Sequence, residues 1–158
     1  YGFSPEQARQ AVGRYREYFS RQGIFENELY PGIKELLENL KRHGVRILLA
    51  SSKPEVYARK ILEHFQLLPF FDFVAAATMD DTRSKKTDVV RYALESCGIS
   101  PDRAVMIGDR HHDIEGAKDN TLESIGVLWG YGSREELSAA GATRLAESVP
   151  QLASLLGL

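Results

Sequence analysis

The chain has 158 residues, of which 43% are hydrophobic and 27% charged, with a formal net charge of -2, as expected for one well-buried globular domain. Because both signs of charge are interspersed, the composition argues against nucleic acid or an acidic membrane as a partner. The single cysteine, Cys97, excludes an internal disulfide. No apolar run is long enough to span a bilayer and no signal peptide is visible, so we expect a cytoplasmic protein.

The first predicted element is a helix that begins after Ser4, with Pro5 at its first position and Gln7 completing a capping box. Four apolar side chains then recur at helical spacing: Ala8, Val12, Tyr15 and Phe19. This spacing predicts a helix with one buried face, which ends at Gly23. Since the chain opens at Tyr1 directly into this helix, we expect it to be a fragment.

From residue 33 onward, helical patterns alternate with short apolar runs. The expected strands are 45–50, 73–77, 104–107 and 124–128, and the expected helices are 33–43, 54–64, 86–97, 112–120, 134–140 and 149–156. The alternation predicts an α/β fold, a doubly wound, Rossmann-like parallel sheet with helices on both faces. Ligands of such sheets bind beyond the carboxyl ends of the strands, so the residues that follow each strand are the candidates for a site.

Two acids follow the predicted strand 104–107. Asp109 comes one residue after Gly108, and Asp113 lies four residues further on, where a helix is expected to begin. Paired carboxylates at such a point suit Mg²⁺, which prefers oxygen ligands. The alternative is that Asp113 only caps the helix.

Two further candidates lie at other strand ends. Ser51 follows the strand 45–50 and precedes a helix, so its hydroxyl and backbone N–H could bind a phosphate oxygen, although it could equally be a helix cap. Lys86 begins a helix, where its charge is unfavourable to the helix dipole, and this suggests a role in neutralising phosphate. Lys85 competes for that role, and a solvated basic turn is the simpler explanation for either lysine taken alone.

Taken together and in this order, these motifs resemble the haloacid dehalogenase superfamily. Ser51 matches its second motif, Lys86 its third, and Asp109 with Asp113 its fourth. The finer resemblance is to phosphoglycolate phosphatase-like and 5'-nucleotidase-like members, and it rests on three stretches: Ser51-Ser52-Lys53-Pro54, Tyr30-Pro31-Gly32 and Gly130-Tyr131-Gly132.

The resemblance implies a Mg²⁺-dependent phosphatase for small phosphorylated metabolites. Ser51, Ser52 and Lys86 would bind the phosphoryl group, with Ser51 and Lys86 serving in catalysis. Asp109 and Asp113 would hold the metal, with Asp113 acting directly or through water or the loop. Arg110 and His112 would support that loop. His111 and the other histidines are expected to be solvated or packed, since no pair has a spacing that argues for zinc.

The family's first motif, Asp-x-Asp-Gly-Thr/Val, is absent, and no Asp-x-Asp occurs in the chain. In the family the first of these aspartates forms an aspartyl-phosphate, so we expect this chain alone to be inactive unless Asp80 or Asp81 substitutes. The strand that carries the motif is central in the family's sheet, between the strands that end at Ser51 and Asp109. Residues 1–24 would be the C-terminal part of a helical cap, and residues 25–158 a hydrolase core without its first strand.

Three alternative hypotheses assign the chain to other classes of protein. A catalytically inactive phosphate-binding or regulatory module would explain the absent nucleophile. A bacterial receiver domain also combines acids, a hydroxyl and a lysine, but its acids come first along the chain. A dinucleotide-binding domain would need Gly-x-Gly-x-x-Gly after a strand, and none occurs. The sequence names neither the phosphate ester nor the oligomeric state.

Overall fold

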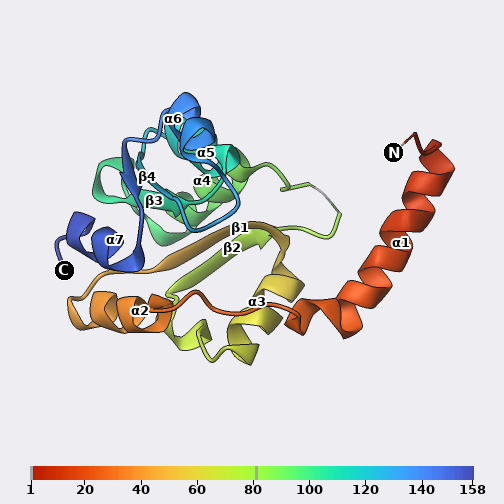
Figure 1. Cartoon of the computed structure of the whole chain (residues 1–158), viewed down its shortest axis with the longest axis horizontal. Helices are drawn as coiled ribbons and strands as arrows, with labels where there is room; N and C mark the ends of the chain where they lie inside the picture. The colour runs from red at the N-terminus through yellow and green to blue at the C-terminus, as the bar shows by residue number, and fades with distance from the viewer. Residues whose placement is uncertain (1, 81) are drawn as a thin grey trace.

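The computed structural model describes residues 2–80 and 82–158, with the side chains of Arg16 and Ser20 outside the description. Helices and strands alternate as predicted (Figure 1). The α-helices are α1 (Pro5–Arg21), α2 (Ile33–Arg42), α3 (Glu55–His64), α4 (Lys86–Cys97), α5 (His111–Asp119), α6 (Arg134–Ala140) and α7 (Val149–Leu155). The strands are β1 (Leu48–Pro54), β2 (Phe73–Ala77), β3 (Val105–Gly108), β4 (Glu123–Val127) and β5 (Arg144–Ala146). Short 3-10 helices are η1 (Gly23–Phe25), η2 (Leu68–Phe70) and η3 (Pro101–Arg103).

The strands pair in parallel throughout, but they form two sheets in place of one. β1 pairs with β2, and β4 lies between β3 and β5. The parallel pairing and the helices on both faces confirm the predicted fold class. Within residues 2–80 and 82–158, however, β1 and β3 each pair on one side only. The break falls where the family resemblance places the absent central strand.

Helices cover both faces of these sheets (Figure 1). α4 packs against β1 and β2 and also contacts α5, which in turn packs against β3 and β4. α3 contacts β1 and β2 as well, and α2 contacts α7. The α4–α5 contact is the structural link that brings the end of β1 and the end of β3 to one site.

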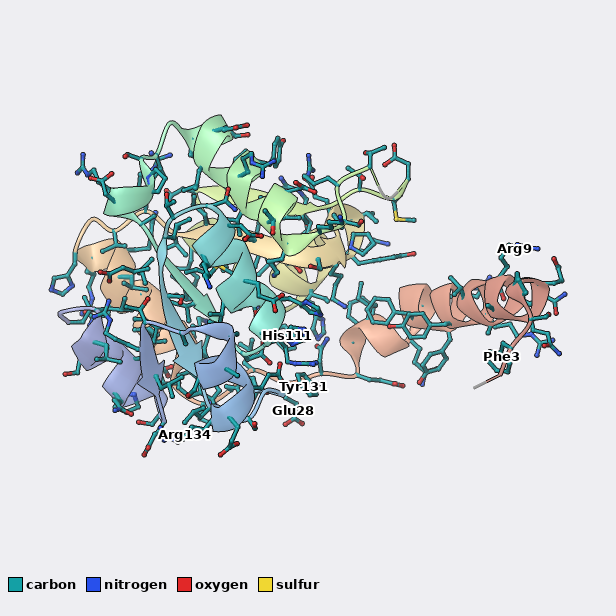
Figure 2. All side chains as sticks on the ribbon, turned by 90° about the horizontal axis from the view of Figure 1, so that it is seen from above. Phe3, Arg9, Glu28, His111, Tyr131 and Arg134 are labelled. Atoms are coloured by element: carbon teal, nitrogen blue, oxygen red, sulfur yellow. The ribbon has the colours of Figure 1, made fainter. Side chains whose placement is uncertain are left out.

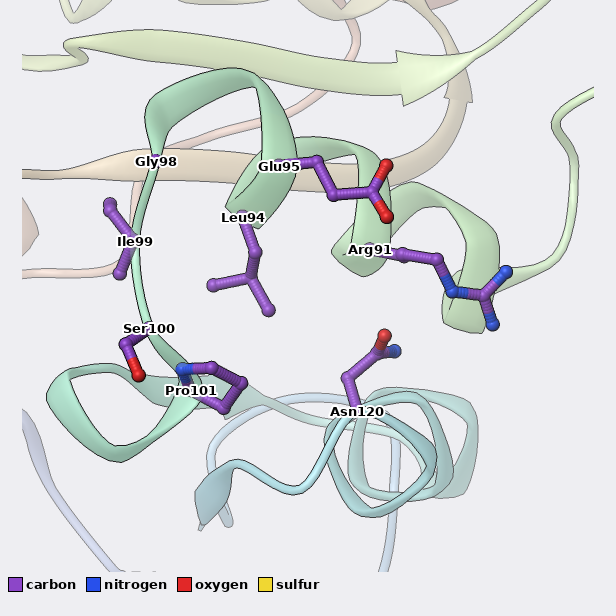
Figure 3. Close-up of a pocket in the computed structure, with 8 residues that line it drawn as sticks. All are labelled: Arg91, Leu94, Glu95, Gly98, Ile99, Ser100, Pro101 and Asn120. Carbon is purple, nitrogen blue, oxygen red and sulfur yellow. The ribbon is translucent and has the colours of Figure 1, made fainter.

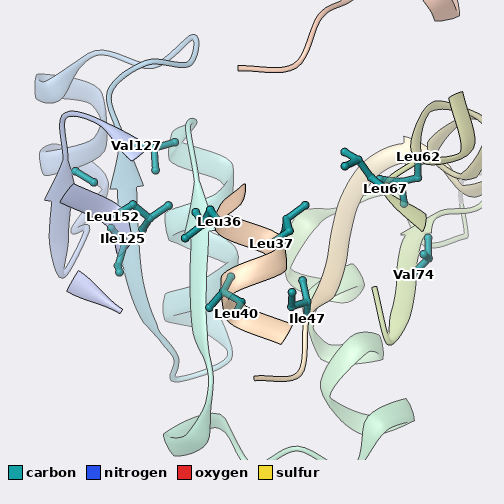
Figure 4. Close-up of a cluster of buried hydrophobic side chains, with 11 residues drawn as sticks. Leu36, Leu37, Leu40, Ile47, Leu62, Leu67, Val74, Ile125, Val127 and Leu152 are labelled. Atoms are coloured by element: carbon teal, nitrogen blue, oxygen red, sulfur yellow. The ribbon is translucent and has the colours of Figure 1, made fainter. Parts of the chain in front are cut away.

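One hydrophobic core joins the two sheets, and α2 lies at its centre (Figure 4). The buried leucines of α2, Leu36, Leu37 and Leu40, recur at helical spacing and form its apolar face. On one side they meet residues of the β1–β2 half, such as Leu62 and Val74. On the other side the same cluster continues into the β3–β5 half: Ile125, Val127, Ala146 and Leu152.

α1 departs from the prediction of a buried face. Its predicted cap is present, because the Ser4 hydroxyl accepts from the Gln7 N–H at 3.2 Å and the Ser4 N–H donates to the Gln7 side chain at 2.9 Å. Yet the helix projects away from the core (Figure 1), and Val12 and Tyr15 are 48% and 59% exposed. The expected burial is therefore wrong for these side chains, because no other described element covers them. The assignment of residues 1–24 to a cap stays a prediction.

The C-terminal end of α1 does contact the core. The Phe19 ring lies edge-on to Tyr57 of α3, with centroids 5.5 Å apart. The Lys53 ammonium lies 4.4 Å from the centroid of the Phe19 ring, and loss of water around it lowers the pKa of Lys53. α1 thus meets the rest of the molecule at the carboxyl end of β1.

Two element boundaries differ from the sequence prediction in informative ways. β1 continues past Ala50 to Pro54, with an irregularity in the ladder between Ser51 and Pro54. β5 was not predicted, because three residues that begin with Arg144 are too short for a hydrophobic pattern. In the part of the chain that the structure describes, no helix is long and apolar enough to cross a membrane.

Candidate active site

Lys86 joins three elements at the carboxyl ends of the strands. Its Nζ donates to the Ala50 carbonyl oxygen of β1 at 2.8 Å and lies 2.8 Å from Asp113 Oδ1 of α5. The side chains of Lys86 and Asp113 are only 12% and 10% exposed. A cation at the first position of α4 opposes the helix dipole, and its close carboxylate partner explains why it is tolerated there. Lys85, the competing lysine, is exposed.

Both oxygens of Asp113 are engaged. While Oδ1 meets Lys86, Oδ2 accepts from the backbone N–H groups of Asp109 and Arg110, each at 3.1 Å. Asp113 therefore orients both the lysine and the loop after β3. This arrangement favours action through the loop over direct metal binding, and the metal assignment of Asp113 stays a prediction.

Asp109 is held from the other side by the segment that follows β4. Its Oδ2 accepts from the Tyr131 N–H at 2.9 Å, and its backbone carbonyl accepts from the Gly132 N–H at 2.9 Å. A Cβ at Gly130 would lie 2.3 Å from the Asp109 Cβ, and one at Gly132 would lie 2.2 Å from the Asp109 carbonyl oxygen. Glycine is thus required at both positions for the segment to approach so closely.

The available carboxylate oxygen of Asp109 suits a hard divalent cation. Asp109 Oδ1 has no hydrogen-bond partner among residues 2–80 and 82–158, so one carboxylate oxygen remains available beside the strand ends. Mg²⁺ usually takes one or two carboxylates and completes its shell with water and substrate oxygens. Asp109 fits the predicted role of metal ligand, and that assignment stays a prediction.

Ser51 lies next to the lysine, since the carbonyl that receives Lys86 belongs to Ala50. The Ser51 side chain is half-buried and its Oγ accepts from the Lys53 N–H at 3.1 Å. Ser52 is exposed, and no side-chain hydrogen bond is recorded for it in the described chain. The structure joins Lys86, Asp113 and Asp109 through direct contacts, and Ser51 adjoins them because it follows Ala50 in β1.

Glu136 of α6 supports the loop, and no sequence motif marks this residue. Its Oε1 accepts from Arg110 Nε at 2.8 Å, and it lies 2.9 Å from both the backbone N and Nδ1 of His111. The hydrogen bond from Arg110, reinforced by those from His111, lowers the pKa of Glu136 to about 2. Arg110 and His111 thus tie the loop to Glu136. His112 Nδ1 lies 3.8 Å from Glu115, and the supporting roles of Arg110 and His112 stay predictions.

Asp80, an alternative carboxylate for the reaction, lies in the loop before α4. Asp80 accepts from the Thr82 hydroxyl at 2.8 Å and from the Thr82 N–H at 3.2 Å. Hydrogen bonds from Thr78 and then Thr82 lower the pKa of Asp80 to about 2. These bonds tie Asp80 to its own loop. Asp81 lies outside the described residues.

A surface pocket lies elsewhere, between the C-terminal ends of α4 and α5 (Figure 3). Leu94, Ile99, Pro101 and Asn120 are among the residues that line it. These residues precede β3 and β4, so the pocket lies at the amino ends of the strands, opposite the candidate active site. Its position excludes it as the phosphate site of this fold.

Comparisons with known proteins find relatives over nearly the whole chain. The family model that matches residues 2–127 is described as haloacid dehalogenase-like hydrolase. A 5'-nucleotidase from Pseudomonas aeruginosa is 40% identical over 99% of this chain and 71% of its own length. The tyrosine-protein kinase PtkA of Mycobacterium tuberculosis is 37% identical over 97% of this chain, which spans 53% of that relative. More distant relatives are named phosphoglycolate phosphatase.

A solved structure is similar over the whole chain. The crystal structure of a predicted phosphatase from Clostridium acetobutylicum has a TM-score of 0.94 and 47% identity, over all of this chain and 74% of that one. The likeness therefore extends over all the elements of this chain, which spans about three quarters of that structure. Except for PtkA, these relatives carry names of phosphoric monoester hydrolases.

Proposed function

Because the chain belongs to the haloacid dehalogenase-like hydrolase family, we propose that it is the core of a Mg²⁺-dependent phosphatase that hydrolyses small phosphate monoesters. The observation that carries the proposal is the bridge from Lys86 to the end of β1 and to Asp113, with one oxygen of Asp109 left available beside it. We expect the reaction to take place in the cytoplasm, and the family resemblance implies a small phosphorylated metabolite as the partner. The names of the relatives support phosphoglycolate or a nucleoside 5'-monophosphate as the substrate class.

The residues of the site divide the work of phosphoryl transfer. Lys86 supplies a positive charge close to the phosphoryl oxygens, and Asp113 fixes its position. Ser51 donates its hydroxyl to a phosphoryl oxygen from the end of β1. Asp109 holds Mg²⁺, which when bound supplies charge neutralisation for the transferring group. Catalysis of this kind consists mostly of positioning and electrostatic stabilisation.

The nucleophile belongs, in our proposal, to a further strand that carries Asp-x-Asp and pairs with both β1 and β3. Two features support this. β1 and β3 each have one unpaired edge within the described chain, and Ile107 of β3 is 37% exposed although it is a large apolar side chain in a strand. Such a strand would place its aspartates between Ser51 and Asp109, where an aspartyl-phosphate could form within reach of Lys86.

The alternative is an inactive phosphate-binding or regulatory module. It is favoured by the absence of Asp-x-Asp from the 158 residues. The intact Lys86–Asp113 bridge fits either alternative, so activity measurements decide between them.

The test is hydrolysis of p-nitrophenyl phosphate, phosphoglycolate and nucleoside 5'-monophosphates by the protein extended at its N-terminus with the sequence that its gene encodes there. We expect Mg²⁺-dependent turnover by the extended protein and none by the 158-residue chain. Lys86→Met should lower kcat by roughly 30- to 1000-fold, the equivalent of about 2–4 kcal/mol. Lys85→Met is the matched control, because Lys85 is the adjacent lysine but is exposed, and it should keep near-normal turnover.

Three results would contradict the proposal. The first is no hydrolysis of any of these esters by an extended protein that contains Asp-x-Asp, which would favour the binding module. The second is equal turnover by the extended and the 158-residue chains, which would mean that a carboxylate within the chain is the nucleophile. The third is an equal loss in Lys85→Met and Lys86→Met, which would remove the special role of Lys86.

A further inference from the structure

Three potential metal ligands meet at the beginning of α5, and none of them has a catalytic role in the proposed phosphatase. They are His111, His112 and Glu115, and one ligand atom from each lies within 4.8 Å of those of the other two. Glu115 is four residues after His111 and three after His112, and side chains at these spacings share one side of a helix. Figure 2 shows His111 on the side of the core that faces α1.

Glu136 holds the His111 ring in an orientation suited to metal binding. His111 Nδ1 lies 2.9 Å from Glu136 Oε1. The same oxygen also accepts from Arg110 Nε at 2.8 Å and from the His111 backbone N–H at 2.9 Å, so Glu136 acts as a hydrogen-bond acceptor toward this loop. We therefore assign the proton of a neutral His111 to Nδ1, which leaves the lone pair of Nε2 free. A carboxylate behind a histidine is the usual support of a metal ligand, since it fixes the tautomer and the ring orientation.

The side chains of His112 and Glu115 are too far apart for a hydrogen bond, but their distance suits two ligands of one metal ion. His112 Nδ1 lies 3.8 Å from Glu115 Oε2, beyond hydrogen-bond distance. Two ligands each about 2.1 Å from a tetrahedral ion are separated by about 3.4 Å. The rings of His111 and His112 have centroids 3.8 Å apart. A small change of side-chain torsion angles would therefore bring all three residues to one ion.

We propose that His111, His112 and Glu115 form a binding site for a divalent d-block cation, Zn²⁺ above all, with a fourth position open to water. Imidazole and carboxylate suit Zn²⁺, whereas Mg²⁺ prefers sites made of oxygen ligands alone. The site is thus chemically distinct from Asp109 and does not depend on the proposed phosphatase activity. The positive end of the α5 dipole opposes a cation here, and the charges of Glu115 and Glu136 offset that effect.

The experiment is calorimetric titration of the 158-residue chain with Zn²⁺ in the presence of millimolar Mg²⁺. We expect one Zn²⁺ per chain. His112→Ala and Glu115→Ala should each weaken binding at least about tenfold, in line with the loss of a direct ligand. Both side chains are exposed, at 65% and 55%, so both variants should fold, which circular dichroism verifies.

Two control variants locate the ion. His43 lies at the C-terminal end of α2, where its Nδ1 contacts the Asn39 carbonyl oxygen, and His43→Ala should bind Zn²⁺ as the unmodified chain does. Asp109→Asn should also retain the zinc site. The proposal is overturned if the chain takes up no Zn²⁺, if His43→Ala weakens binding as much as His112→Ala, or if Asp109→Asn abolishes binding that His112→Ala retains. The last result would place the Zn²⁺ at the phosphatase site.

Discussion

At the scale of single residues, Lys86 and Asp113 form an ion pair in which both side chains are largely buried. The pair positions the lysine and also the loop after β3. The lysine faces the phosphate region because its ammonium is held between Asp113 Oδ1 and the Ala50 carbonyl. The aspartate fixes the loop that carries Asp109. Since a charge without its partner is costly at such a site, the folded state should be sensitive to either substitution.

The first prediction is that Lys86→Met and Asp113→Asn each destabilise the chain by about 3–5 kcal/mol, because each leaves a buried charge or its hydrogen-bonding group without its partner. The double variant should be less destabilised than the sum of the two, with a coupling of about 1–3 kcal/mol. Urea unfolding of the four proteins measures both quantities. Additive effects would mean that the two side chains act independently.

The second prediction concerns acid stability. The folded-state pKa of Glu136 is about 2, below its ordinary value of 4.5. A depressed carboxyl pKa stabilises the fold fully above pH 4.5, and this contribution is lost as the pH falls through about 2. The difference in melting temperature between the unmodified chain and Glu136→Gln should therefore shrink from pH 4.5 to pH 2.

Arg110→Met gives a second measurement of the same effect. The hydrogen bond from Arg110 is the largest cause of the lowered pKa, so its removal should move the acid loss of stability to higher pH. A constant difference between Glu136→Gln and the unmodified chain over this pH range would contradict the assignment.

Sequence patterns identify site residues that lie near the boundaries of predicted elements. They do not identify Glu136, whose contact with the site depends on how distant helices pack. Lys86 and Asp109 each lie next to a helix or strand terminus, and Ser51 follows an apolar run, so a local pattern marks all three. Glu136 lies 26 residues beyond Arg110 and has the appearance of an ordinary charge near a helix start. Only the packing of α5 against α6 reveals its contact.

At the scale of elements, the close approach of α4 and α5 depends on a glycine. Gly116 lies within α5, where a glycine costs about 1 kcal/mol relative to alanine. A Cβ at this position would lie 2.7 Å from Lys86 Cγ and 3.2 Å from the Lys86 backbone carbon. The glycine thus permits the first turn of α4 to lie against α5, which is the contact that positions the lysine.

The third prediction compares two helical glycines. Gly116→Ala should destabilise the chain by about 1–3 kcal/mol, because the added methyl group forces α4 and α5 apart. Gly13→Ala in α1 is the matched control, since a Cβ there meets no atom within 4 Å, and it should stabilise its helix by up to about 1 kcal/mol. Thermal unfolding and far-UV circular dichroism measure the two effects. Equal stabilisation by both changes would show that Gly116 has no packing role.

The differences between expected and observed elements also have physical causes. The helical spacing of α1 predicted a helix correctly, but spacing alone does not specify which surface covers the apolar face, and Val12 and Tyr15 are exposed in the described structure. β5 is stabilised by its pairing with β4 and not by a pattern of its own. The alternation of the remaining elements was predictable because each helix and strand has its own apolar periodicity.

At the scale of the whole molecule, the two sheets share one hydrophobic core, but within residues 2–80 and 82–158 no strand of one sheet pairs with a strand of the other. α2 and its leucines connect the halves (Figure 4), while β1 and β3 each have an unpaired edge within the described residues. Unpaired strand edges invite association with other chains. The core therefore holds the halves together, and the edges remain the least protected part of the sheets.

The fourth prediction is that amide hydrogens of β3 exchange faster than those of β4 in the 158-residue chain. Both strands belong to the same sheet, but β4 pairs on both sides and β3 on one. Alternate N–H groups of β3 point to its open edge, where no strand protects them. Hydrogen–deuterium exchange of peptides that cover β3 and β4 should show a difference of at least about tenfold for these amides.

The same measurement on the extended protein tests the proposed central strand directly. If a strand with Asp-x-Asp pairs with both open edges, the amides of β3 should become as slow to exchange as those of β4, while β4 itself changes little. The exposed Ile107 side chain should become buried in the same step, because the new strand covers it. Equal protection of β3 and β4 in the 158-residue chain would show that the edge is already paired, for example by a second copy of the chain, which sedimentation would reveal. Fast exchange of β3 in the extended protein would instead place the added strand elsewhere, and the nucleophile would not lie between Ser51 and Asp109.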